Sequence, residues 1–575
     1  MKNREIASLF QKMADILESK DDNPFKINAY RKAVRILSDL TTDIEEIAQS
    51  GELQKIPGIG KGTAEKIVEY LETGTITKFE QLRKNISDEF IALLGISGLG
   101  PKTVALLHKE LKINGLDDLK RAIADGSLTC LPGMGEKKIE NILRGIELYT
   151  LSKERMTISE ALNTAREVIK QLKRSTDITM IEAAGSLRRG KETIGDIDIL
   201  ATGKKGEKII DAFVHLPVAN DILAQGDTKG SIVTETGTQL DLRVVGKDSF
   251  GAALQYFTGS KSHNIRLREI AKGEHLKINE YGIYSAQKKI GGKREEDIYT
   301  ALHMDWIPPE LREDRGEIEA ALNHALPSLL NHSDIKGDLH THSTYSDGAH
   351  SLEEIALKAK EMGYQYVAIT DHSQSLKIAK GLSESRLKEK IAAGKRINKK
   401  LAGIKIITGA EVDIKNDGTL DYPDTLLKQL DLVIGAIHSG FKQKREQITK
   451  RITTAMKNPY LHIIAHPTGR LLGEREPYDL DINQVIEMAG KTGTALEINA
   501  HTERLDLDDI NCIKAKQQGV MLAIGTDAHH LDQLWMMELG VTVARRGWLE
   551  PENVLNSFTA EELIKWAKSK RARMH

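Results

Sequence analysis

The sequence predicts a multidomain protein with three parts, which are a helical region with repeated hairpin turns, an α+β region and a C-terminal region of repeated βα units that form a parallel sheet or a barrel. In residues 1–150 the apolar residues follow a helical period, whereas residues 150–315 change to short alternating strands broken by helices. From residue 336 onward, short apolar runs alternate with amphipathic helical stretches, as in repeated βα units. The length of 575 residues suits several cores, because one domain takes roughly 150 residues.

Composition and charge exclude several classes of protein. With 82 Lys and Arg against 83 Asp and Glu, the net charge is −1, so a nucleic-acid partner has to be argued from motifs. Cys130 and Cys512 lie far apart, which leaves neither a disulfide framework nor a cysteine zinc site and fits a reducing, cytoplasmic setting. No stretch approaches the roughly 18 apolar residues of a membrane span, so we expect no membrane partner.

The helical region repeats one short phrase three times, at residues 56–60, 96–100 and 131–135. Each copy is an apolar residue, a small residue or proline, and Gly-x-Gly leading into a helix, whose unpaired N–H groups can seat a phosphate. One copy would more often be an ordinary turn, but three copies followed by lysines favour sequence-independent binding of the DNA backbone. The residues expected at this interface are Gly58, Gly60, Lys61, Gly98, Gly100, Lys102, Gly133 and Gly135.

Three aspartates are predicted to gather at one edge of the α+β region. Strand alternation sends Asp196 and Asp198 to one face, and the same alternation places Asp241 opposite buried leucines of another strand. Three carboxylates on neighbouring strands repel one another unless cations lie between them, and two divalent ions about 4 Å apart suit phosphoryl transfer.

A glycine-serine turn precedes these aspartates. Gly185 and Ser186, with Arg189, supply backbone N–H, hydroxyl and guanidinium donors for phosphate oxygens. An isolated Asp-x-Asp would be weak evidence, since exposed aspartates are usually only solvated. In this order, the turn and the three aspartates indicate nucleotidyl transfer.

The predicted barrel carries nine nitrogen or oxygen donors at or near the ends of its strands, which converge on one face of a βα barrel. Any single histidine would more often be an ordinary residue than a ligand, but the recurrence makes coincidence improbable. Mixed imidazole and carboxylate ligands suit Mn²⁺, Zn²⁺ or Fe²⁺, and such a centre would hydrolyse a phosphate ester. The donors are His340, His342, Asp347, His372, Glu411, His438, His466, Asp527 and His529.

Residues 1–315 resemble the DNA polymerase X family, which includes polymerase beta. The resemblance lies in residues 185–190, 195–198, 256–260 and 279–282, and reaches back to residues 28–33. It implies a nucleotidyltransferase palm with a nucleotide-binding subdomain, two Mg²⁺ or Mn²⁺ ions on the aspartate triad, and a deoxynucleoside triphosphate as substrate. It further implies that Ser186 and Arg189 hold the triphosphate within a site to which Gly185, Gly195, Arg155, Tyr256, Phe257, Gly259 and Asn264 also contribute. The resemblance also implies that Tyr256 and Phe257 exclude a nucleotide with a 2′-hydroxyl and that Asn264 recognises the base of the nucleotide.

The same resemblance implies a second activity in the N-terminal domain. Lys66 matches the lysine that removes a 5′-deoxyribose phosphate through a Schiff base, and Lys26, Tyr30 and Arg31 match DNA contacts. Two positions depart from the family pattern, since Phe25 replaces a phosphate-binding histidine and Gly62 replaces a second lysine. The alternative is that Lys66 is a plain surface lysine.

Residues 336–570 resemble the PHP (polymerase and histidinol phosphatase) domain, a distorted barrel of seven βα units with up to three metals. All nine ligand positions are filled. Arg470 follows His466 and has two interpretations, a substrate-phosphate ligand or a surface salt bridge.

The resulting expectation is a monomeric, cytoplasmic repair enzyme that acts on gapped or primer-template DNA. It combines gap filling with a metal-dependent phosphoesterase, for which 3′-5′ exonuclease and abasic-site endonuclease action are both open. Two rivals are a small-molecule phosphatase like histidinol phosphatase, with a non-catalytic DNA-binding half, and a DNA clamp or scaffold without turnover. The expected domains are 1–80 and 81–150 (helical), 151–255 (palm), 256–315 (nucleotide-binding), 316–335 (linker) and 336–575 (PHP).

Overall fold

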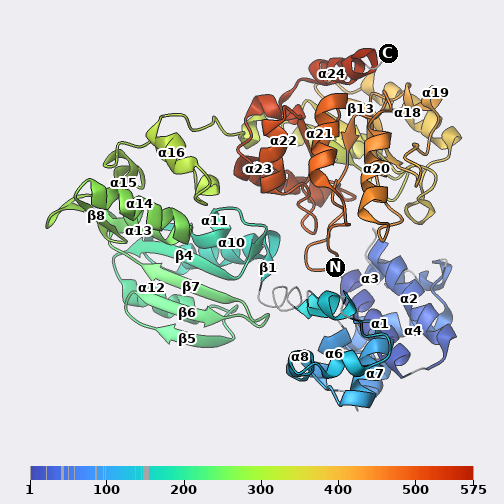
Figure 1. The fold of residues 1–575 in the computed structure, drawn as a ribbon, viewed down its shortest axis with the longest axis horizontal. Coiled ribbons are helices and arrows are strands. Elements are labelled where there is room, and N and C mark those ends of the chain that lie inside the picture. Colours follow the sequence, from blue (N-terminus) through green and yellow to red (C-terminus); the bar gives the residue numbers. More distant parts are fainter. Residues whose placement is uncertain are drawn as a thin grey trace. The chain divides into compact units, whose positions relative to one another are not determined.

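The computed structural model separates the chain into two compact units, Met1–Lys153 and Glu154–His575, drawn in Figure 1. No helix among the described residues is both long and apolar enough to cross a membrane. The structure describes residues 2–20, 22–39, 44–49, 51–56, 58–84, 87–94, 96, 99–135, 137–143, 145–146 and 155–573.

The first unit is helical. Its first core packs α1 against α2 through residues such as Phe10 and Leu37, and its second core contains Val104 and Leu107 of α7. Helices α4 and α7 each start directly after a glycine, Gly60 and Gly100, as the repeated phrase predicts. The helices are α1 (Lys2–Ser19), α2 (Pro24–Asp39), α3 (Ile44–Gln49), α4 (Lys61–Thr73), α5 (Thr77–Arg83), α6 (Asp88–Leu94), α7 (Pro101–Leu111) and α8 (Leu116–Ala124).

The second unit begins with a palm whose five-stranded sheet has the order β2-β4-β7-β6-β5. A capping box between Thr157 and Glu160 starts helix α10, which covers the apolar face of the sheet together with α12 (Figure 1). Strands β4 and β7 run parallel at its centre. The elements are β1 (Met156–Thr157), α10 (Ile158–Ser175), β2 (Ile178–Ala183), α11 (Gly185–Arg188), β3 (Thr193–Ile194), β4 (Asp196–Gly203), α12 (Gly206–Val214), β5 (Asp221–Gln225), β6 (Lys229–Val233) and β7 (Gln239–Val244).

A smaller subdomain follows, with a three-stranded antiparallel sheet of order β10-β9-β8. Its core includes Leu267, Ile283 and Tyr299. The elements are α13 (Phe250–Thr258), α14 (Lys261–Gly273), β8 (Leu276–Asn279), β9 (Gly282–Ser285), β10 (Lys288–Gly291), α15 (Glu296–Thr300) and α16 (Glu317–Leu322).

A buried ion network ties this subdomain to the palm. The Glu295 carboxylate, 7% exposed, accepts hydrogen bonds from Arg188 at 2.7 Å and from Arg312 at 2.8 Å. Burial alone would raise the pKa of Glu295, but the hydrogen bond from Arg188 and the charge of Arg312 lower the pKa of Glu295 from 4.5 to about 2. Ionised Glu295 therefore stabilises the folded protein fully above pH 4.5, and this stabilisation is lost as the pH falls towards 2.

Replacing Glu295 with glutamine should lower the free energy of unfolding by about 3 kcal/mol at pH 7, because the buried Arg312 and the partly buried Arg188 lose their counter-charge. Urea unfolding followed by tryptophan fluorescence measures this difference, which should shrink between pH 5 and pH 3. Glu296 is the exposed neighbour of Glu295, and the control substitution Glu296→Gln should leave the free energy of unfolding unchanged. A Glu295→Gln difference that is independent of pH would contradict the assignment.

The C-terminal part is a nearly closed barrel of seven parallel strands in the order β11 to β17, which confirms the predicted seven-unit barrel. A parallel bridge between Thr341 and Ala528 brings the first and last strands together. The strands are β11 (Gly337–Thr341), β12 (Tyr366–Ile369), β13 (Lys405–Asp413), β14 (Leu432–Ala436), β15 (Ile463–Ile464), β16 (Ala495–Asn499) and β17 (Leu522–Gly525).

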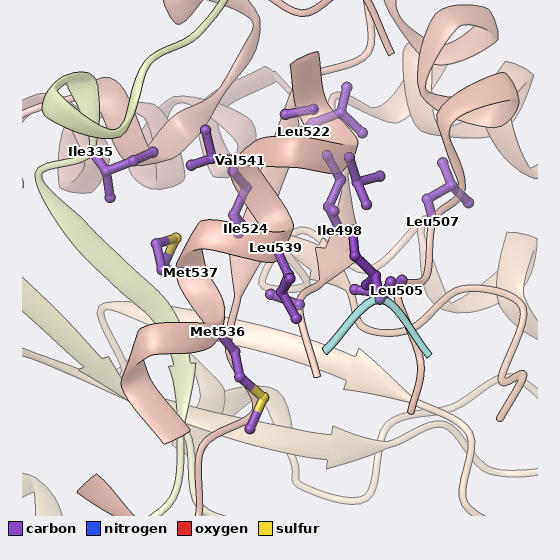
Figure 2. Close-up of a cluster of buried hydrophobic side chains, with 14 of the residues drawn as sticks. Ile335, Ile498, Leu505, Leu507, Leu522, Ile524, Met536, Met537, Leu539 and Val541 are labelled. Carbon is purple, nitrogen blue, oxygen red and sulfur yellow. The ribbon is translucent and has the colours of Figure 1, made fainter. Parts of the chain in front are cut away.

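Helices cover the outside of the barrel, and buried aliphatic side chains seal them to the strands. Figure 2 shows Leu539 and Val541 of α23 beside Ile498 and Ile524 of the last two strands. Inside, Gly525 allows close packing, since a Cβ there would lie 2.4 Å from both the His340 Cβ and a Glu497 carboxylate oxygen. The helices are α17 (Leu352–Glu361), α18 (Glu384–Asn398), α19 (Asp424–Leu427), α20 (Arg445–Ala455), α21 (Ile482–Thr492), α22 (Asp509–Gln517), α23 (Met537–Arg546) and α24 (Ala560–Arg573).

Candidate active sites in the palm and the barrel

The palm brings the three predicted aspartates to adjacent strands. In the parallel register of β4 and β7, Asp198 lies opposite Asp241, while Ile197 and Leu240 point into the core. Asp241 Oδ1 accepts a hydrogen bond from Ser231 at 2.5 Å, which holds this carboxylate at the sheet edge. The alternation expected from the sequence is present in both strands.

Electrostatic repulsion within this triad fits a cation site. Burial, followed by the charges of Asp196 and Asp241, raises the pKa of Asp198 from 3.8 to about 6. Oxygen ligands with such mutual repulsion are what a divalent ion relieves. Gly185 has φ +60° and lies so close that a Cβ there would be 2.4 Å from Asp198 Oδ2, so a glycine is required at this position.

An open cleft of about 480 Å³ is lined by Asp196 and Asp198 of the triad. It collects most of the predicted nucleotide-binding residues, whereas Gly195 and Asp241 are outside its lining. It also contains three cationic residues that the sequence argument missed, Lys191, Lys261 and Arg268; Arg268 lies one helical turn after Asn264, a spacing that could have found it. The predicted residues in its lining are Arg155, Gly185, Ser186, Arg189, Asp196, Asp198, Tyr256, Phe257, Gly259 and Asn264.

Several of these side chains are already held by protein groups. Arg155 donates to the Thr193 hydroxyl at 2.9 Å, and Asn264 donates to the Tyr256 carbonyl at 2.7 Å. The Tyr256 and Phe257 rings meet edge to face at 5.2 Å. The cleft is therefore lined by fixed donors and an aromatic wall, a surface suited to a phosphorylated nucleoside.

In the barrel, the predicted ligands converge on one buried site. Ligand atoms within 4.8 Å of one another form three groups. The ninth donor, His466, lies with Nε2 3.0 Å from Glu411 Oε1, which joins it to the same site. The groups are His342 with Asp347, His372 and His529; His340 with His342 and Asp527; and His372 with Glu411 and His438.

The donor atoms of this site fit metal ions. His372 Nδ1 and Glu411 Oε2 lie 2.8 Å apart, yet neither makes a hydrogen bond, and His342 Nδ1 and Asp347 Oδ1 are likewise buried without one. Buried polar atoms are nearly always satisfied, so these atoms indicate missing cationic partners. His466 at φ +28° and Asp527 at φ +54° adopt strained left-handed backbone, a feature of functional sites.

Two further carboxylates orient the ligands, and the sequence argument did not find them. Glu497 accepts from His340 Nδ1 at 2.6 Å, and Asp413 accepts from His438 Nδ1 at 2.7 Å. Carboxylates that fix the imidazole ring in this way are typical of metal centres. Burial would lower the pKa of His438, but the carboxylates of Glu411 and Asp413 outweigh this effect and raise that pKa to about 10. The His438 ring therefore holds a proton near neutral pH, and a divalent cation would replace this proton.

Arg470 forms an ion pair, but this pair does not lie at the surface as the alternative expected. Its guanidinium donates to Glu192 of the palm at 2.6 Å and to the Arg504 carbonyl at 2.9 Å. The ion pair is largely buried, with Arg470 13% exposed, so it is an internal contact between barrel and palm.

Most of the predicted DNA-binding residues of the first unit that the structure describes lie at turns and helix starts, whereas Tyr30 lies within α2. Lys26, Lys61 and Lys102 are exposed at or near helix N-termini, and Tyr30 packs against Phe10 with ring centroids 5.5 Å apart. Gly58 and Gly133 have φ of +106° and +77°, and Gly98 lies outside the described residues. Lys66 Nζ donates to the Gly62 carbonyl at 2.9 Å.

Comparisons with known families agree with this division. The sequence matches models described as helix-hairpin-helix domain (1–76), SAM-like helix-hairpin-helix tandem (90–147), DNA polymerase beta palm (155–250), DNA polymerase beta thumb (253–313) and PHP domain (338–501). We therefore call the smaller subdomain the thumb.

Similar proteins extend the comparison. The chain is 41% identical over 574 residues to a DNA polymerase/3′-5′ exonuclease PolX of Bacillus subtilis, covering 99% of this chain and 100% of that protein. It is 32% identical to a probable phosphatase of Thermoanaerobacter sp. over 40% of this chain and 96% of the phosphatase. It is also 27% identical to DNA polymerase lambda of Arabidopsis thaliana, over 54% of this chain and 62% of the polymerase.

A polymerase-beta-type palm and thumb, two helix-hairpin-helix regions and a PHP barrel in one chain define a DNA-binding nucleotidyltransferase joined to a metal-dependent phosphoesterase. The chain belongs to the DNA polymerase X family, in the form that carries a C-terminal PHP domain.

Proposed function

We propose that this protein is a DNA-directed DNA polymerase that fills short gaps during repair, and that its PHP barrel is a 3′-5′ exonuclease. The observation that carries the proposal is the presence of both sites in one chain: the aspartate triad, two members of which line the cationic cleft, and all nine donors gathered in the barrel. The relative from Bacillus subtilis combines the same two activities in its name.

In the palm, Asp196, Asp198 and Asp241 would hold two Mg²⁺ or Mn²⁺ ions, which activate the primer hydroxyl and neutralise the triphosphate when bound. Ser186, Arg189 and Arg155, which line the same cleft, would bind phosphate oxygens of the deoxynucleoside triphosphate. The Tyr256 and Phe257 wall occupies the space beside the sugar, and Asn264 reaches the base. The remaining basic residues of the cleft, Lys191, Lys261 and Arg268, add positive charge for the substrate.

In the barrel, the nine donors would hold up to three ions of Mn²⁺, Zn²⁺ or Fe²⁺, which supply a hydroxide near neutral pH when bound. Glu497 and Asp413 keep the His340 and His438 rings in the orientation for binding. The arrangement hydrolyses a phosphodiester at the 3′ end of DNA. Fusion to the polymerase raises the effective concentration of each site for the product of the other.

The test uses a 5′-labelled primer on a one-nucleotide gapped duplex with a 5′-phosphate and Mn²⁺. With the templated nucleotide, we expect a primer one residue longer, and without it, shorter products. An unchanged primer in both reactions would overturn the proposal, and turnover of histidinol phosphate would then favour the small-molecule phosphatase. Gap binding without any turnover would favour the scaffold. A monomer is expected by light scattering.

Lys66 gives the first unit a separate chemical test. We expect its amine to add to the C1′ aldehyde of a 5′-deoxyribose phosphate with loss of water, so that borohydride traps the imine on DNA. Lys66→Ala should remove the trapped product and leave gap filling unchanged, whereas the exposed Lys78→Ala should change neither. If the trapped product still forms in Lys66→Ala, another amine carries out the reaction. If no product is trapped in wild type, Lys66 has no lyase role and is a plain surface lysine.

A further inference from the structure

One carboxylate, that of Glu313 in the thumb, lies among three cationic side chains, two from the palm and one from the barrel. Its Oε1 is 3.1 Å from Arg189 Nε of the palm, 3.5 Å from Lys191 Nζ and 3.2 Å from Arg546 NH1 of the barrel. Glu313 is 11% exposed, and Arg189 is 13% exposed. Burial would raise the pKa of Glu313, but the charges of Arg189, Arg546 and Lys191 outweigh it and keep that pKa low, so the group is a carboxylate.

Arg546 also fixes the backbone of the phosphate-binding turn. It ends helix α23, is 3% exposed, and donates from NH1 to the Arg189 carbonyl at 2.6 Å. Its NH2 donates to Asp509 at 2.5 Å. The helix packs tightly on this turn, because a Cβ at Gly190 would lie 2.2 Å from the Thr542 methyl group. Arg546 of the barrel therefore contacts both the main chain of Arg189 and the Glu313 carboxylate, which is the counter-charge of the Arg189 guanidinium.

Nucleotide binding changes the charge balance at this junction. The Arg189 guanidinium lines the cleft but is held by Glu313 and by the Thr258 carbonyl. Lys191, the second cation on Glu313, lines the same cleft. When a triphosphate attracts Arg189 and Lys191, Glu313 stays buried, and a buried carboxylate without a cation is strongly disfavoured. Only Arg546 lies outside the cleft lining among these three cations.

We propose that Arg546 of the PHP barrel is a positioning residue for nucleotide binding by the polymerase. It keeps Glu313 neutralised, so that Arg189 can turn from Glu313 to the triphosphate, and it fixes the turn from which Arg189 extends. This inference rests on the proposed function, in which Arg189 binds the triphosphate. The barrel thus contributes to the affinity of the polymerase for its substrate as well as to hydrolysis.

The experiment measures KM and kcat for the deoxynucleotide in single-nucleotide gap filling by the full-length protein. Arg546→Gln should raise KM about tenfold, the effect of one charge-assisted contact, and leave kcat within about twofold. Adding Glu313→Gln should return KM to within about threefold of wild type, because the buried charge that needed Arg546 is gone. Arg546→Lys should be intermediate, since it keeps the charge but not the fork of donors.

The matched control is Arg545→Gln, on the adjacent residue of α23. Arg545 pairs with Glu310 of the thumb at 2.7 Å, so its loss removes an equivalent contact without touching Arg189. Its KM should equal that of wild type, and exonuclease activity on single-stranded DNA should be unchanged in all variants. An equal rise in Arg545→Gln, or no rescue by Glu313→Gln, would reduce Arg546 to a structural residue and overturn the inference.

Two outcomes separate this inference from the proposed function. If wild type does not extend the primer, the proposed function fails, whereas normal extension with an unchanged KM in Arg546→Gln refutes the inference alone. Should Arg546→Gln fail to fold, the single variant Glu313→Gln decides. This variant releases Arg189 from Glu313, so its KM for the deoxynucleotide should be lower than that of wild type. An unchanged or higher KM in that variant would overturn the inference.

Discussion

Replacing Asp198 with asparagine is expected to lower the rate of nucleotide addition by about 10³-fold or more, because metal stabilisation of the reacting charges is worth several kcal/mol. Asp198 lies opposite Asp241 on the central strands and carries the repulsion of both other acids. Asparagine keeps the size of the side chain but removes the charge that two cations require. Single-turnover primer extension in rapid-quench experiments measures the loss.

The control for this variant is Asp221→Asn, an exposed carboxylate on the edge strand of the same sheet, which should extend primers at the wild-type rate. Exonuclease activity should persist in Asp198→Asn, since its ligands lie in the barrel. Near-normal extension by Asp198→Asn would remove the triad from the reaction. Loss of both activities would indicate that the substitution disturbs the fold.

Replacing Glu411 with glutamine is expected to lower exonuclease activity by about 10³-fold or more, because the residues that would hold the metal ions lose a negative charge. Glu411 is 1% exposed, and its carboxylate oxygens lie within 4 Å of nitrogen atoms of five imidazole rings. The metal content of the purified protein, measured by plasma mass spectrometry, should fall together with the activity.

Gap filling provides the internal standard for Glu411→Gln and should match wild type. Glu389→Gln, on the exposed side of α18, should keep both metal and exonuclease activity. Full metal content with full activity in Glu411→Gln would contradict the assignment of the site. Dialysis against a chelator should reproduce the loss in wild type, and added Mn²⁺ should restore it.

The aspartates of the palm and most of the barrel donors follow from the period of a strand or from its end, whereas other cleft residues, such as Tyr256 and Asn264, were expected only from the family resemblance. Asp198 and Asp241 meet because a period of two fixes which side chains face out of the sheet. The barrel histidines converge because parallel strands end on one face. Such rules need only local sequence.

Residues that escaped prediction depend on contacts between distant segments. Glu497 lies on an apolar strand like the predicted ligands, but its role becomes visible only through the His340 ring, 157 positions away. Arg546 and Glu313 are ordinary charges in the sequence, and their burial follows from the packing of α23 on the palm. Ion pairs across domains carry no periodic signal, so they require the fold.

Closure of the barrel has a consequence for how the metal site assembles. His342 and Asp527 lie 3.1 Å apart although 185 residues separate them, and they meet only where the first and last strands join. Contacts of such long sequence separation form late in folding, because a large loop entropy has to be overcome first. Metal ions should therefore bind tightly only to the completed barrel, accelerating refolding little and slowing unfolding strongly.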